Sequence, residues 1–65
     1  MFKVTREWLL DNATPKGGWT RYQLQLVGIE WPPVHGWMAK AADRLISDES
    51  KKAFETLGRI GEVEL

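Results

Sequence analysis

Few side chains in this sequence could do covalent or metal chemistry. It has one histidine, His35, and no cysteine, which excludes a thiolate nucleophile and a thiolate metal site. The acids nearest to His35 in sequence are Glu30 and Asp43. Two prolines separate Glu30 from His35, and His35 with Asp43 alone supplies too few ligands for a metal ion. We therefore predict no catalytic residue, no metal site and no cofactor, and we expect that the protein is not an enzyme.

The hydroxyl groups and the paired glycines have structural interpretations. Ser47 and Ser50 lie where a helix would begin, without a base nearby, which favours helix capping. Gly17 and Gly18 follow a proline and lack the spacing of a phosphate-binding loop. This segment is expected to connect two helices.

Four tryptophans are the most informative residues: Trp8, Trp19, Trp31 and Trp37. So short a chain needs large side chains to build a core, and each tryptophan can bury roughly 150–250 Å². Tryptophan and arginine are also favoured as anchors in protein interfaces. We expect most of the rings to be packed in the core and one or two to remain exposed for a partner.

Length and charge limit the class of protein. The 65 residues predict a single domain, 1–65. Nine basic and nine acidic residues cancel, without the basic surplus typical of nucleic-acid-binding proteins. No apolar run resembles a signal peptide or approaches a transmembrane span. We expect a cytoplasmic protein without a membrane partner.

Local signals divide the chain into short helices. Thr5 and Thr20 are candidate N-caps for helices over residues 6–12 and 20–27, the second with a capping box completed by Gln23. The apolar spacing from Val34 to Ile46 is that of an amphipathic helix, in which Gly36 should mark a close approach. Ser47 begins a last helix that Gly58 is expected to end.

The expected fold class is mainly α. We predict a single small domain of three to four short helices, with a middle pair that resembles a helix-turn-helix. Phe2 and Val4 alternate like a strand, as do Val63 and Leu65, so the two ends of the chain could pair as a short β-ribbon or the tail could be loose.

A helix-turn-helix from Thr20 to Ala39 would suggest DNA binding. Gly28 would then lie at the turn, and Arg21, Lys40 and Arg44 could contact phosphates. Leu24 stands where a small residue normally allows close helix crossing, and the second helix begins without side chains suited to reading bases. DNA binding by a regulator or recombination accessory protein is therefore the alternative function.

Several short segments form a pattern: Thr5-Arg6-Glu7-Trp8-Leu9-Leu10, Lys16-Gly17-Gly18-Trp19-Thr20, Gln23-Leu24, Gly28-Ile29, Trp31-Pro32-Pro33, Gly36-Trp37 and Ile46-Ser47. In these segments the sequence resembles small uncharacterised proteins encoded by bacteriophages and prophages. If the protein is phage-encoded, we expect it in the cytoplasm of the host cell. The resemblance covers about residues 3–57 and implies a viral context, but it implies no activity or site. This chain has Val34-His35 where that group has more lysine, which argues against a phosphate role.

Together these patterns predict a non-catalytic accessory protein that binds a macromolecule. A host or phage protein that it modulates or inhibits is the first choice of partner, DNA is the second, and self-assembly as a homodimer is the third. The expected partner-binding residues are Arg21, Trp31, His35, Lys40 and Arg44.

Overall fold

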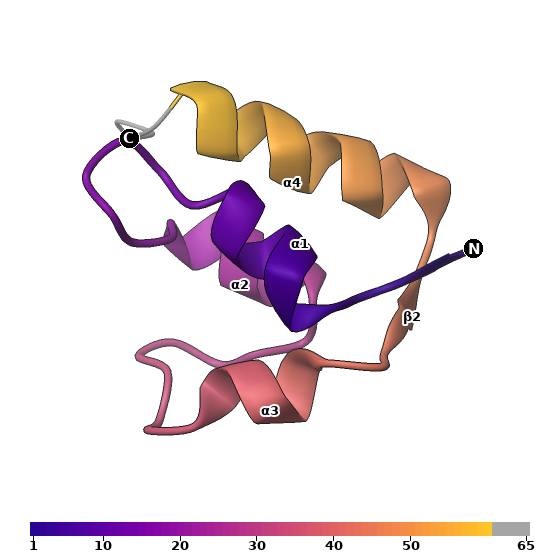
Figure 1. Cartoon of the computed structure of the whole chain (residues 1–65), viewed down its shortest axis with the longest axis horizontal. Helices are drawn as coiled ribbons and strands as arrows, with labels where there is room; N and C mark the ends of the chain where they lie inside the picture. Colours follow the sequence, from indigo (N-terminus) through magenta and orange to yellow (C-terminus); the bar gives the residue numbers. More distant parts are fainter. Residues whose placement is uncertain (61–65) are drawn as a thin grey trace.

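The computed structural model describes residues 1–60 of the chain (Figure 1). These residues form four helices and a short two-stranded antiparallel sheet, so the predicted mainly α fold class is confirmed. In chain order the elements are β1 (Phe2–Lys3), α1 (Arg6–Asp11), α2 (Arg21–Leu26), α3 (Trp37–Ala41), β2 (Leu45–Ile46) and α4 (Asp48–Ile60).

Three helices begin at the capping residues that the sequence indicates. The hydroxyl groups of Thr5 and Ser47 each accept the backbone N–H three residues further on, at 3.1 and 3.0 Å. Thr20 and Gln23 form the complete capping box, with each side chain accepting the other's backbone N–H at 3.0 and 2.8 Å. These bonds satisfy N–H groups that have no partner within the helix. The segment after Thr20 is therefore the helix that its capping box predicts.

The helices pack in two pairs. α2 packs against α4, and α1 packs against α3. In Figure 1, α4 runs along one edge of the molecule and α3 lies at the opposite edge, with α1 and α2 between them. β2 connects α3 to α4 and pairs with β1, so the N-terminal strand is tied to the middle of the chain.

The sheet differs from the predicted ribbon in its partner strand. Phe2 pairs with Ile46 in an antiparallel register, and the ladder continues where Val4 donates to the carbonyl of Arg44 and accepts from Asp43, at 2.8 and 2.7 Å. Val63 and Leu65, the other candidates for pairing, lie outside the described residues. The N-terminal strand is thus confirmed, but it pairs with residues that the sequence pattern had assigned to a helix.

The predicted helix from Val34 to Ile46 is shorter at both ends. It begins after Gly36, whose φ is +83°, and it ends before Asp43, whose φ is +73°. Both are left-handed conformations, which glycine adopts freely and Asp tolerates better than most residues. A Cβ added to Gly36 would meet no atom within 4 Å. The glycine is therefore needed for its backbone angle, and the expected close approach is wrong.

A small apolar core holds the elements together. It is built from aliphatic side chains and one phenylalanine. α1, α3, α4 and β2 each contribute one of them, and the other two lie just after β1 and just after α2. Leu24 of α2 is also buried. The cluster consists of Val4, Leu9, Val27, Ala41, Ile46 and Phe54.

The tryptophans lie at the border of this core. Trp8, Trp19 and Trp37 are partly buried and pack against the core cluster, whereas Trp31 is half exposed. The rings of Trp19 and Trp37 meet edge to face with centroids 5.0 Å apart, a favourable aromatic geometry. The indole N–H of Trp19 donates to the Leu9 carbonyl at 2.9 Å. Three rings therefore stabilise the fold, and Trp31 is left for another role.

Glu55 joins α4 to α1. Its Oε2 lies 2.8 Å from Nζ of Lys51 and accepts the indole N–H of Trp8 at 2.9 Å. The Trp8 ring also packs on Phe54, with centroids 4.4 Å apart. The hydrogen bonds from Lys51 and then from Trp8 favour the ionised carboxylate and lower the pKa of Glu55, although partial burial opposes them.

We expect Glu55→Gln to destabilise the protein at neutral pH but not in acid. Because folding lowers the pKa of Glu55, ionised Glu55 stabilises the fold above the ordinary glutamate pKa of about 4.3, and this contribution is lost as the pH falls through the lowered value. Glutamine keeps an acceptor for Trp8 but lacks the charge for Lys51. Urea unfolding over a pH series should show a difference below about 1 kcal/mol that disappears in acid. A difference independent of pH would contradict this assignment.

Gly58 lies inside α4 rather than at its end. The helix continues to Ile60, and Gly58 is buried against the backbone of Asn12, which follows α1. A Cβ built on Gly58 would collide with the carbonyl oxygen of Asn12 and lie 3.1 Å from Nε2 of Gln23. The predicted helix end is therefore wrong: this glycine is needed because the backbone after α1 crosses α4 here.

Candidate functional site

Residues 28–36, which follow the C-cap Val27 of α2 and lead to α3, form the Trp31 loop. Its first residues are fixed by α2, since Gly28 and Ile29 donate their N–H groups to the carbonyls of Gln25 and Leu24 at 3.1 and 2.9 Å. Gly28 has a φ of +77°, which fits its predicted place just after a helix. Ile29 is partly buried against the core. The loop therefore leaves α2 in a defined direction.

Arg44 holds the same end of the loop from the other side. Its Nη1 donates to the carbonyl of Gly28 at 3.3 Å, and its Nε donates to the carbonyl of Lys40 at 3.1 Å. A side chain on Gly28 would collide with this guanidinium. Arginine has five N–H donors, so the remaining N–H groups of the exposed guanidinium can still face a ligand.

Two apolar side chains of the loop are open to solvent. Trp31 is 50% exposed and Val34 is 57% exposed. Pro32 and Pro33 stand between them and fix two φ angles; the Trp31–Pro32 peptide bond is cis. The loop thus presents apolar surface on a backbone with few free torsions.

A hollow lies on each side of the Trp31 loop. The first has a volume of about 350 Å³ and the second about 290 Å³. Gly28, Ile29 and Glu30 contribute to both, so this short stretch is the wall between them. The first hollow is also lined by Arg21, Gln25 and Trp31, and the second by Pro32, Val34, Trp37, Lys40 and Arg44.

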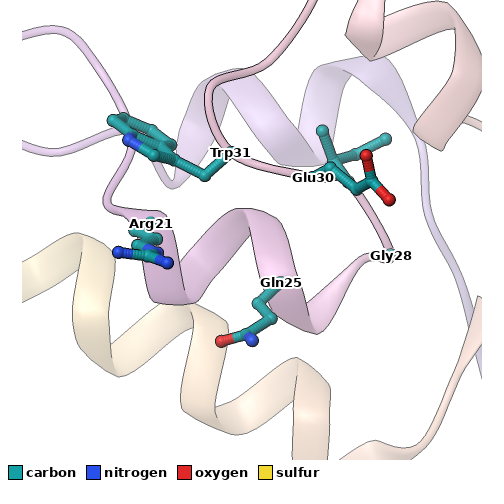
Figure 2. A pocket seen from close by; sticks show the side chains of 6 residues that line it. Arg21, Gln25, Gly28, Glu30 and Trp31 are labelled. Atoms are coloured by element: carbon teal, nitrogen blue, oxygen red, sulfur yellow. The ribbon is translucent and has the colours of Figure 1, made fainter.

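Figure 2 shows how the side chains of the first hollow are arranged. The Trp31 ring and the Arg21 side chain lie at the same end, and Gln25 follows from the next turn of α2. The carboxylate of Glu30 lies at the other end and points away from Trp31 (Figure 2). The aromatic and cationic groups are thus together, and the acid is apart from them.

The cations around the Trp31 loop are not neutralised within the described residues. The ion pairs between side chains there join Lys3 to Asp43 at 3.6 Å and Lys51 to Glu55 at 2.8 Å. None of them includes Arg21, Lys40 or Arg44. These three charges can therefore meet an external anion without first breaking an ion pair with residues 1–60.

The structure brings four of the five predicted binding residues around one loop. Arg21 and Trp31 line the first hollow, and Lys40 and Arg44 line the second. His35 is an exposed residue of the loop but lines neither hollow.

Val34, Glu30 and Gln25 are among the residues of this surface that the sequence did not indicate. The sequence pattern assigned Val34 to the buried face of a helix, and Glu30 was considered only as a possible metal ligand. Gln25, exposed on α2, carried no signal of its own, because only the packing of the loop beside α2 gives it a place at the site.

The middle helices do not adopt the tight geometry of a DNA-binding helix-turn-helix. Residues 27–36 join α2 to α3, whereas that motif uses a turn of about three or four residues. α3 has only 5 residues, little more than one turn, which is short for a recognition helix. The predicted resemblance therefore extends to the order of the two helices but not to the turn between them.

Residues 1–60 contain no group of three or more His, Cys, Asp or Glu side chains placed to hold a metal ion. No helix in this range combines the length and apolar character needed to cross a membrane. No protein-family model, curated protein or solved structure matches the chain.

Proposed function

We propose that this protein is a non-catalytic binding module that docks on another protein through the Trp31 loop. It acts in the cytoplasm, as a phage-type accessory protein that modulates or inhibits a host or phage protein. The observation that carries the proposal is the half-exposed Trp31 ring beside two hollows. These hollows are lined by Arg21, Lys40 and Arg44, which have no ion-pair partner in residues 1–60. Trp and Arg are the residues most enriched where interfaces gain their affinity.

The anchoring of the loop supports the same function. Binding is weakened by the entropy lost when a mobile segment becomes ordered. Here Ile29 packs against the core, Arg44 bonds to Gly28, and two prolines follow Trp31. A partner therefore meets a ring that is already held near one position.

Trp31→Ala is expected to abolish most of the binding while leaving the fold intact. A half-exposed ring outside the core contributes little to folding, so the free energy of unfolding should change by less than about 1 kcal/mol. Loss of a central anchor should cost at least about 2 kcal/mol of binding, or about 30-fold in Kd. The measurement is capture of a partner from host-cell lysate, followed by calorimetry with the purified partner.

Leu10→Ala is the matched control for this substitution. Leu10 is also 50% exposed but lies on α1 and lines neither hollow. The proposal requires that Leu10→Ala retain the partner and that Trp31→Ala lose it. Equal retention by both variants would show that the partner binds elsewhere.

A further inference from the structure

We propose that the partner segment held by the Trp31 loop is an acidic peptide with an apolar side chain between carboxylates. This inference rests on the proposed function, and it specifies which side chains the bound segment of the partner should have. Two observations lead to it. The cations lie on either side of the exposed apolar side chains of the loop, and these cations form no ion pairs with residues 1–60.

Charge complementarity is the first argument. Lys3 and Lys51 have carboxylate partners, whereas Arg21, Lys40 and Arg44 have none among residues 1–60. In the same range, the two hollows are lined by these three cations and by a single acid, Glu30. The surface is therefore locally positive in a chain whose formal net charge is zero, and an anionic ligand gains attraction here.

The order of groups across the loop gives the pattern of the ligand. Arg21 lies on the side of the first hollow, and Lys40 and Arg44 lie on the side of the second. The exposed surfaces of Trp31 and Val34 belong to the loop between them. A segment lying across the loop would thus meet a cation, then apolar surface, then two cations. Carboxylates on either side of one apolar residue match this order.

Glu30 favours a peptide over a nucleic acid strand. It belongs to the wall shared by both hollows, so a strand crossing that wall would bring phosphates close to its carboxylate. A nucleic acid carries a charge at every nucleotide and cannot omit the one beside Glu30. A peptide can place its carboxylates at the cations and offer a backbone N–H to Glu30, a charge-assisted hydrogen bond.

The test uses the full chain labelled with ¹⁵N and four synthetic probes. The first probe is a peptide with one leucine between two pairs of glutamates. In the second, serine replaces the leucine; in the third, lysines replace the glutamates; and the fourth is a short oligothymidylate. Shifts of the Trp31 indole N–H and of backbone amides in residues 28–36 report binding at this surface. We expect the first probe to bind at least about tenfold more tightly than the others, and less tightly as salt increases.

Arg21→Glu and Arg6→Glu form a matched pair of variants. Each arginine is the first residue of a helix, α2 and α1 respectively, so the glutamate meets the same favourable helix dipole in both and folding should not suffer. Arg6 lines neither hollow. We expect Arg21→Glu to weaken the leucine-containing acidic peptide about fivefold or more, and Arg6→Glu to change its Kd by less than twofold.

The outcomes separate this inference from the proposed function. Three results would each overturn the inference. The lysine peptide or oligothymidylate could bind as tightly as the acidic peptide, the two arginine variants could have equal effects on its Kd, or the acidic peptide could cause no shift. These results concern only the chemistry of the peptide. If Trp31→Ala loses its protein partner in the capture experiment, the proposal of protein docking at Trp31 still stands. If Trp31→Ala keeps its partner while the acidic peptide shifts the loop, the docking proposal fails and the peptide site remains.

Discussion

Gly58→Ala should destabilise this protein by about 3 kcal/mol or more, the upper range for adding atoms to a packed site. Alanine normally improves a helix interior by up to about 1 kcal/mol relative to glycine. Here the added methyl group would collide with the carbonyl of Asn12 and crowd the amide of Gln23. Domains this small rarely have more than about 3–5 kcal/mol of stability, so a large fraction of the variant should be unfolded at room temperature.

Circular dichroism during urea unfolding measures this effect. Gly18→Ala is the control, because a Cβ at Gly18 meets nothing within 4 Å and its φ is not in the left-handed region. That variant should match the wild type or be slightly more stable, since alanine restricts the unfolded chain. The close approach of the Asn12 backbone to α4 at Gly58 would be wrong if both alanine variants unfolded at the wild-type urea concentration.

Gln23→Leu should be the other severe substitution. Gln23 is completely buried, and its Nε2 donates to the carbonyls of Asn12 and Phe54 at 2.9 and 3.2 Å, while Oε1 accepts the backbone N–H of Thr20 at 2.8 Å. Leucine fills the space but makes none of these bonds. Each polar group left buried without a partner costs about 1–3 kcal/mol, so we expect a loss of about 3 kcal/mol or more.

Two further variants show which of these bonds matters. Gln23→Glu keeps an acceptor for Thr20 but replaces the donor that faces two carbonyl oxygens, so it should also be strongly destabilised, with a deficit that grows as the carboxyl group ionises. Gln25→Leu changes an exposed glutamine on the same helix and should stay within about 0.5 kcal/mol of the wild type. Thermal and urea unfolding of the three variants give the comparison. Equal stability of Gln23→Leu and Gln25→Leu would exclude a structural role for the buried amide.

Features of the fold that depend on interactions between residues close in sequence could be predicted from the sequence. Thr5, Thr20 and Ser47 begin helices because their hydroxyl groups reach N–H groups three residues away. The left-handed turn at Gly28 follows from the same kind of short-range signal. These predictions need no knowledge of the rest of the chain.

Contacts between distant segments account for the errors. Leu45 and Ile46 continue a helical spacing, but β1 needs a strand beside it, so they form β2. Gly58 resembles a helix end, but its lack of a side chain is used for contact with Asn12. In each case a tertiary contact prevailed over a local preference.

The candidate site was predictable by residue type but not by geometry. Tryptophan and arginine are general interface anchors, which was enough to select Trp31, Arg21 and Arg44. Lys40 and His35 were added as exposed polar residues near the expected helix after Pro33. The hollows, the hydrogen bond from Arg44 to Gly28 and the shared wall at Glu30 depend on how the loop packs between α2 and α3. His35 was among the expected binding residues, but the packed loop places it outside both hollows.

The buried amide of Gln23 has a consequence for recognition. It lies on the same short helix as Arg21 and bonds to the backbone of α4 through Phe54. Local unfolding of α2 would therefore break the contact with α4, so the proposed docking surface around the Trp31 loop and the rest of residues 1–60 should melt as one cooperative unit. A ligand that engages Arg21 would then raise the melting temperature of the whole molecule rather than stiffen one loop.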